Sequence, residues 1–159
     1  MIKNGNFTNT SIISKFDVNY FEKNKPNYIV RVIPLDSKNV EAAELTVNFD
    51  KNDGSTKIMT ASYGGETFHQ QYIYYFNDIN NFLLIEKFQQ WDRPYSEDRR
   101  LEKVDEINKY YFENISMVVW IDSDGKIVDS QSKKFKQKEQ EILGQLDKLL
   151  VVLNTGERK

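Results

Sequence analysis

The chain has 159 residues, a formal net charge of −2 and no cysteine. Nearly balanced charge gives no basic surface for DNA or RNA, so we expect no nucleic-acid partner. The lack of cysteine excludes disulfides, a thiolate nucleophile and a cysteine-ligated zinc. No apolar run approaches the roughly 18 residues of a membrane-spanning helix, which predicts a soluble domain without a transmembrane segment.

The start of the chain predicts a flexible lead-in followed by a helix. Residues 1–10 are rich in Asn and Thr and are expected to form the lead-in. A helix is predicted over 11–23, although Val18 also permits a short extended segment, and Pro26 ends it. Residues 11–155 are predicted to fold as a single domain. The helix prediction depends on one apolar face, formed by Ile12, Ile13, Phe16 and Tyr20.

The middle of the chain predicts an antiparallel meander. Residues 28–33 are mainly β-branched and lie between two prolines, which is typical of a short or edge strand. Apolar and polar residues alternate over 45–49, and the Asp-Gly pair at 53–54 suits a hairpin turn. The strands that follow are expected over 56–63, 67–77 and 82–91.

Residues 92–106 are almost entirely polar, and this pattern predicts a long connection between strands. The strand pattern resumes at 107–112 and 115–122. An Asp-Gly turn at 124–125 then leads into a last short strand at 126–129.

The end of the chain predicts an amphipathic helix that begins after Ser132 as N-cap and stops at Gly156. Its apolar stripe must pack on an apolar surface, and the sheet is the only candidate. The predicted fold class is α+β: an antiparallel β-meander of six to eight strands, with an N-terminal helix and this C-terminal amphipathic helix packed on the sheet. The stripe is formed by Phe135, Ile142, Leu146, Leu149, Leu150 and Leu153.

The sequence holds no complete catalytic, metal-binding or cofactor-binding motif. His69 is the only histidine, which excludes a two-histidine metal site, and no nucleophile motif surrounds it. The segment 50–54 resembles a calcium loop, but Gly stands at its position five instead of six, and Ala61 replaces the glutamate at position twelve. The Gly-Gly pair at 64–65 lacks the spacing of a phosphate-binding loop. We predict no catalytic residue, metal or cofactor.

Aromatic residues of the predicted strands point to both faces of the sheet. Successive strand residues alternate in direction, so one member of the pair Tyr74-Tyr75, and one of Tyr110-Tyr111, must lie on the second face. Two interpretations stay open. The outer tyrosines either cover the strand surface, or they form a concave face that binds a ligand or partner. The candidate binding residues are Tyr75 and Tyr111.

The polar connection carries a second group of candidate residues. It opens with Trp-Asp-Arg-Pro-Tyr at 91–95. An arginine beside aromatic rings can bind a carboxylate or sulfate, or stack on a ring. Long loops in compact domains are often functional. The alternative is a structural corner with surface ion pairs. The candidate binding residues are Trp91, Arg93, Tyr95 and Arg99.

The order of these features resembles a group of bacterial proteins. Tyr-Tyr-Phe occurs at 74–76 and again at 110–112, and Trp-Ile-Asp at 120–122 precedes the second Asp-Gly turn. Over roughly residues 40–153 the chain resembles Bacteroidetes-like exported or lipoprotein-type proteins with repeated Tyr-Tyr-Phe hairpins and no assigned activity. The resemblance transfers no functional residue. It implies an exported, periplasmic or lipid-anchored location with the signal removed, which we favour slightly over a cytoplasmic one.

Together these features favour a non-catalytic binding or interaction module of bacterial origin. It would use an aromatic sheet face and the 91–100 loop to bind a protein or a small molecule. Two alternatives stay open. One is an immunity or inhibitor protein with a dedicated partner. The other is a small hydrolase that uses carboxylates of the polar connection, namely Glu97, Asp98, Glu102, Asp105 and Glu106.

Overall fold

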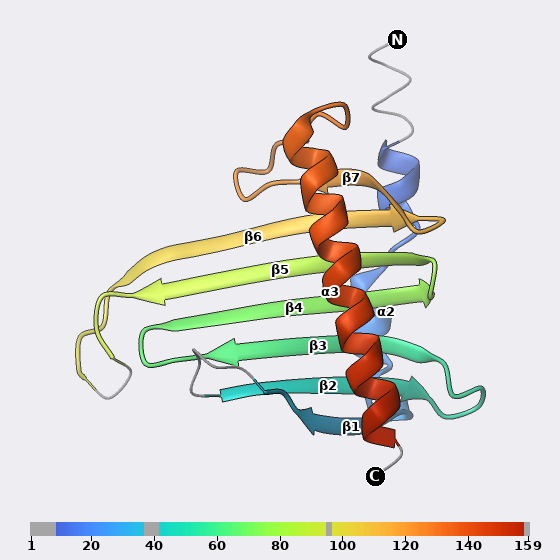
Figure 1. Cartoon of the computed structure of the whole chain (residues 1–159), viewed down its shortest axis with the longest axis horizontal. Coiled ribbons are helices and arrows are strands. Elements are labelled where there is room, and N and C mark those ends of the chain that lie inside the picture. The colour runs from blue at the N-terminus through green and yellow to red at the C-terminus, as the bar shows by residue number, and fades with distance from the viewer. Residues whose placement is uncertain (1–8, 37–41, 95–96, 158–159) are drawn as a thin grey trace.

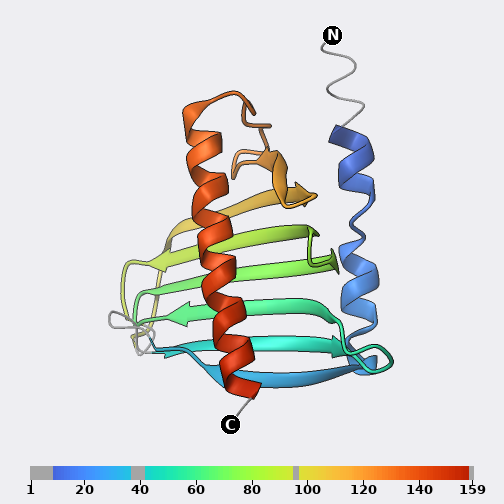
Figure 2. The same cartoon turned by 45° about the vertical axis from the view of Figure 1, so that its right-hand side comes forward.

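The computed structural model describes residues 9–36, 42–94 and 97–157, and it contains one sheet with helices on both faces. Figure 1 shows α3 crossing one face of the sheet, and Figure 2 shows the N-terminal helices on the other side. A helical segment at 9–14 comes first. The elements that follow are α2 (Val18–Lys23), η1 (Lys25–Asn27), β1 (Tyr28–Pro34), β2 (Ala42–Asp50), β3 (Thr56–Gly64), β4 (Phe68–Asp78), β5 (Asn81–Trp91), β6 (Glu102–Glu113), β7 (Ser116–Ile121) and α3 (Lys133–Glu157).

The sheet has seven strands in chain order from β1 to β7, and every neighbouring pair is antiparallel. Short connections join most of the strands, as expected for a meander. Gly54 and Gly125, each from a predicted Asp-Gly turn, have φ of 73° and 79°, a left-handed conformation that glycine adopts without steric cost. The predicted α+β fold class, with its meander and two helical regions, is confirmed.

The larger core lies between the sheet and α3. The predicted N-cap is present, because the Ser132 hydroxyl accepts a hydrogen bond from the Phe135 N–H at 3.3 Å. The apolar stripe of α3 then packs on aromatic rings from the middle strands. Phe82 and Phe112 stack with centroids 4.5 Å apart. The fully buried side chains of this core include Leu45, Val47, Met59, Tyr74, Phe76, Phe82 and Phe112.

A second core lies on the other face, beneath the N-terminal helices. Ile12 and Phe21 are buried there against the strand residues whose side chains point away from α3. Side chains on a strand alternate between the two faces, so the sheet has apolar residues on both. The strand residues of this core are Ile58, Tyr75, Leu83, Ile85, Tyr111 and Val119.

The N-terminal helix predicted over 11–23 is broken into two pieces. The Asp17 carboxylate accepts a hydrogen bond from the Tyr20 N–H at 3.2 Å and caps a new helix, α2. The break turns Tyr20 outward, where it is 63% exposed, and places Phe21 in the core at 6%. The predicted apolar stripe was therefore correct at Ile12 and wrong at Tyr20.

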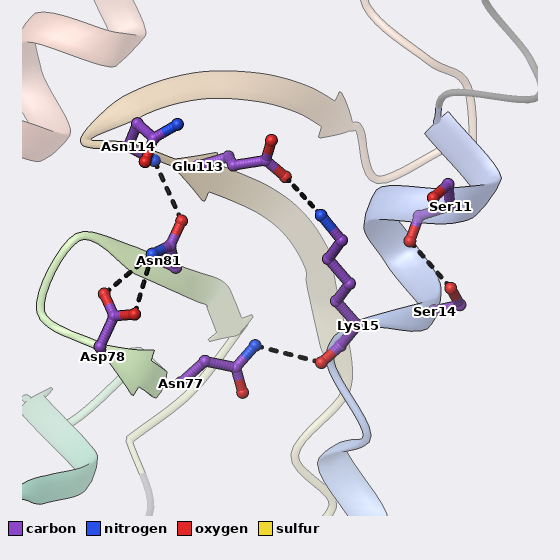
Figure 3. A network of polar contacts seen from close by, with 8 residues as sticks. All are labelled: Ser11, Ser14, Lys15, Asn77, Asp78, Asn81, Glu113 and Asn114. Carbon is purple, nitrogen blue, oxygen red and sulfur yellow. Dashed lines mark hydrogen bonds and ion pairs between the residues drawn. The ribbon is translucent and has the colours of Figure 1, made fainter.

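Polar contacts connect the segment between the two N-terminal helical pieces to the hairpin turns of the sheet (Figure 3). Lys15 Nζ lies 3.1 Å from the Glu113 carboxylate. The Lys15 carbonyl accepts a hydrogen bond from Asn77 Nδ2 at 3.1 Å. The Asn81 carboxamide oxygen accepts the Asn114 N–H at 3.0 Å and so joins two hairpin turns. These contacts fix the N-terminal helices at one end of the strands.

The long connection predicted over 92–106 is shorter than expected. β6 begins at Glu102, and its first residues pair with the end of β5, with Gln89 opposite Asp105. These positions of β6 are mostly exposed. Their polarity therefore reflects the absence of a covering layer, because backbone pairing requires no apolar side chains.

Two predicted boundaries near the end of the chain were also wrong. Residues 126–129 form no strand, and only a single bridge joins Ile127 to Ile121. The helix α3 continues past Gly156 to Glu157, since glycine is tolerated within a helix at a modest energetic cost. Among the described residues, no helix combines the length and apolarity needed to cross a membrane.

The two helical layers cover the same half of the sheet. In Figure 1, β3 to β6 extend well beyond α3 on the left. In Figure 2 the N-terminal helices stand at the other end of the strands, away from this extension. We call the uncovered part the open half. It consists of 62–64 of β3, 68–71 of β4, 87–91 of β5 and 102–107 of β6.

Candidate functional site

The candidate tyrosines Tyr75 and Tyr111 are buried, at 3% and 4% exposure. Each points to the face opposite its neighbour, as predicted, but the N-terminal helices cover that face. The Phe21 ring lies 5.5 Å from Tyr75, and the Phe16 ring lies 5.8 Å from Tyr111. In this conformation the two tyrosines belong to a core and present no surface to a ligand.

The Tyr75 hydroxyl has a structural partner. It donates a hydrogen bond of 2.7 Å to the Glu22 carboxylate. Burial, and then this hydrogen bond, raise the pKa of Tyr75. Burial alone raises the pKa of Tyr111. These contacts anchor α2 to the sheet, so Tyr75 and Tyr111 serve to attach the N-terminal helices.

The described candidates of the 91–100 loop have different surroundings. Trp91 is half-buried, and its ring lies 4.2 Å from the guanidinium of Arg100, which was not among the named candidates. Arg93 is exposed, with Nε 3.7 Å from the Asp92 carboxylate. Arg99 is exposed in a left-handed conformation with φ of 60°. Tyr95 lies outside the described residues.

Hydrogen bonds close the connection at its base. The Asp92 N–H donates to the Leu101 carbonyl at 3.0 Å, and the Asp92 carboxylate accepts the Leu101 N–H at 2.8 Å. The stacking of Arg100 on Trp91 adds a cation–π contact of about 0.5–2 kcal/mol. Asp92 and Leu101 are therefore joined at the base of this connection, and Arg93 and Arg99 are exposed.

A different set of residues forms a groove on the α3 side of the open half. Strand pairing places Gln70, Phe88 and Glu106 side by side on β4, β5 and β6. The next row toward α3 is Tyr72, Glu86 and Asn108 on the same strands. The groove has a volume of about 410 Å³. Its lining residues are Gln70, Glu86, Phe88, Glu106, Asn108, Tyr110, Trp120 and Lys138.

Hydrogen bonds fix the polar floor of the groove. Glu86 is half-buried, and its carboxylate accepts the Tyr110 hydroxyl at 2.7 Å and the Gln70 side-chain amide at 3.3 Å. The Trp120 indole N–H donates to the Asn108 carboxamide oxygen at 3.1 Å. These partners come from four strands, so the groove is preorganised by the sheet itself.

The groove has negative electrostatic character. Glu86 and Glu106 line it, and in the described chain no Lys or Arg lies within ion-pair distance of either carboxylate. Lys138 lines the groove too, but it pairs with Glu141 of α3 at 3.2 Å. Burial, followed by the charge of Glu86, raises the pKa of Tyr72 to about 12.

Half-buried aromatic rings surround this polar floor. Phe88 lies within the groove, and Tyr72 contributes to a small adjoining cavity of about 70 Å³ beside α3. The Tyr63 ring meets Tyr72 edge-on at 6.1 Å. Phe68 is half-buried on the same face. Rings around fixed acceptors can bind a ligand through its apolar surface and its hydrogen-bond donors.

The sequence contained one signal for this groove. Leu84, Glu86, Phe88 and Gln90 share one face of β5, so two polar residues interrupt a face that is otherwise apolar. The neighbours on β4 and β6 could not be assigned without the register. His69 lies on the other face of β4, opposite Gln89, and contributes nothing to the groove.

A second cavity of about 560 Å³ lies between α2 and the β2–β3 hairpin. Its two carboxylates have structural partners: Asp17 caps α2, and Asp50 accepts the Asn52 N–H at 2.7 Å within the hairpin turn. Lys15, which also lines it, pairs with Glu113. Within the described ranges, no three His, Asp or Glu side chains gather closely enough to hold a metal ion.

Comparisons with protein-family models, curated proteins and solved structures found no match. The arrangement of the described residues is therefore the basis for any functional assignment.

Proposed function

We propose that the chain is a non-catalytic binding module whose ligand occupies the groove between α3 and the open half of the sheet. The observation that carries the proposal is the Glu86 carboxylate, held by Tyr110 and Gln70 in a groove bordered by Phe88. The acceptor is fixed in position, and the ring beside it is only half-buried. This combination of a hydrogen-bonded polar group and apolar surface is typical of ligand sites.

Electrostatics favours a ligand that carries a positive charge. The groove contains two carboxylates without a cationic partner among the described residues, and the one amine beside them is already paired. A cation can form a charge-assisted hydrogen bond with Glu86 and contact the neighbouring rings. The described residues of the 92–101 connection, which follow the end of β5 (Figure 1), would provide the outer contacts of a larger ligand.

The hydrolase alternative gains little from this arrangement. Of the acids in the predicted polar connection, only Glu106 lines the groove. A pair of catalytic carboxylates must flank the substrate at a defined separation, and the other four acids of that connection do not line the groove. The immunity or inhibitor interpretation, the bacterial origin, and the exported or lipid-anchored location stay predictions.

The test is a nuclear magnetic resonance screen of the full chain with small aromatic compounds that differ only in charge. We expect amide shifts to cluster at residues of the groove, with cationic compounds binding more tightly than neutral or anionic analogues. The Phe88→Ala variant should lose these shifts. The control variant Ile107→Ala, on the opposite face of β6 and 41% exposed, should retain them.

The result that would contradict the proposal is equally specific. Ligand-induced shifts that cluster elsewhere, or that persist unchanged in Phe88→Ala, would show that the groove is not the binding site. Both variants must first give dispersed spectra and unchanged circular dichroism, so that loss of binding is not caused by unfolding.

A further inference from the structure

The two edges of the sheet differ in how they are protected. Beyond β7 the chain folds back, and the Val128 N–H donates to the Trp120 carbonyl at 2.9 Å. The Glu139 carboxylate of α3 also accepts the Met117 N–H at 2.7 Å. β1 pairs with β2 on one side, and no other strand of the described chain lies beside it. Among the strands of the described residues, only β1 is open to a further strand.

The side chains of β1 provide little of the protection that is usual at an edge. Ile29, Val30 and Val32 are 52%, 53% and 57% exposed. Edge strands usually avoid pairing with other chains through charges, bulges or a short length. β1 has seven residues in regular register with β2 and carries one charged residue, Arg31. Proline, which interrupts pairing, stands only at its end as Pro34.

An apolar surface of α3 continues this edge. Val151, close to the end of α3, is 63% exposed. It lines a cavity of about 520 Å³ together with Val32 and Ile33 of β1. Figure 1 shows the end of α3 lying over β1 at this side of the sheet. The side chains of Val30 and Val32 point to the face of the sheet away from α3, so apolar side chains are exposed on both faces at this edge. Exposed apolar surface often marks an interaction site.

We propose that β1 pairs with β1 of a second copy of this chain, antiparallel about a two-fold axis at Val30. The strand order supports a second copy as occupant, because the protected edge at β7 prevents head-to-tail addition. A copy can add only through its own β1, which gives an isologous contact that closes at two subunits. This interface is separate from the groove and goes beyond the proposed binding function.

The register centred on Val30 follows from side-chain pairing. It places Tyr28 opposite Val32 of the partner, and Ile29 opposite Arg31 of the partner. A register centred on Arg31 would oppose two like charges, which is unfavourable. A register centred on Val32 would bring Pro34, which has no N–H, into the paired region.

The first experiment measures molecular mass by sedimentation and light scattering as the concentration of the full chain rises. We expect a monomer–dimer equilibrium. Val30→Lys should weaken it about tenfold, because symmetry places two positive charges directly opposite each other. Ile107→Lys, which makes the same change at an exposed strand position away from the edge, should leave it unchanged.

The second experiment uses the absence of cysteine from the chain. Single-cysteine variants at positions 29, 30, 32 and 107 are oxidised under identical conditions. Residues directly opposite in an antiparallel pair approach closely enough for a disulfide, so Val30→Cys should cross-link fastest. Ile107→Cys should cross-link only at the background rate.

Three outcomes would overturn the proposal. Fastest cross-linking through position 32 refutes the register. Equal association by the Val30→Lys and Ile107→Lys variants refutes β1 as the interface. A chain that stays monomeric and cross-links only at background refutes a second copy as the occupant of this edge.

Discussion

Replacing Phe21 with alanine tests whether the second face of the sheet is a core. Phe21 is 6% exposed and packs 5.5 Å from the Tyr75 ring. Truncation of a buried phenylalanine costs about 3–5 kcal/mol. We expect a value near 3 kcal/mol, because the N-terminal helices can shift to fill part of the space. For a chain of this size that corresponds to a fall of about 6–12 °C in melting temperature.

The neighbouring residue provides the matched control. Tyr20 lies on the same short helix but is 63% exposed, so Tyr20→Ala should change the free energy of unfolding by about 0.5 kcal/mol or less. Urea denaturation of both variants, analysed by the same linear extrapolation, gives the two free energies of unfolding. Equal losses in the two variants, or a loss below about 1 kcal/mol in Phe21→Ala, would refute the assignment of Phe21, Tyr75 and Tyr111 to a packed core.

Three further predictions concern the helix break, the acid stability and the groove. Asp17→Ala removes the cap of α2 and should cost about 1 kcal/mol in urea denaturation; an unchanged midpoint would contradict the capping role. Burial of Glu22 opposes ionisation, but hydrogen bonds from Lys25 and Tyr75 outweigh it and lower its pKa below 4.5. Its contribution to stability is therefore present above pH 4.5 and is lost as the pH falls through the lowered pKa. Tyr75→Phe should reduce this acid-induced loss in melting temperature, and an identical pH profile would exclude the contribution of the hydroxyl. Glu86→Gln keeps an acceptor but removes the charge, so it should weaken binding of cationic compounds about tenfold in calorimetric titrations; equal affinity would show that the charge of Glu86 is not used.

Features that depend on nearby residues were predicted well from the sequence. The strand expected over 67–77 is found as Phe68–Asp78, and the one expected over 82–91 is found as Asn81–Trp91. Both follow from alternation between turn residues. The pattern failed over 102–106, because alternation records which side chains are buried and this part of β6 has no covering layer.

The candidate site was harder to predict because it depends on which elements cover the sheet. Alternation correctly separated Tyr74 from Tyr75, but the exposure of Tyr75 depends on the docking of Phe21, about fifty residues earlier in the chain. Likewise, Glu86 acquires its role from Gln70 and Tyr110. Those contacts require the register of three strands, which a single sequence does not specify.

The open half of the sheet is itself an argument for a binding role. Ordering a residue costs about 1–2 kcal/mol in backbone entropy, and burial beneath a helix normally offsets that cost. The pairing of β5 with β6 nevertheless continues as far as Trp91 and Glu102, well beyond α3. A domain selected for stability alone could end its strands where the helices end. Strands that continue past their cover, with Phe88 and Glu86 on one face, are better explained if that face gains its remaining contacts from a ligand.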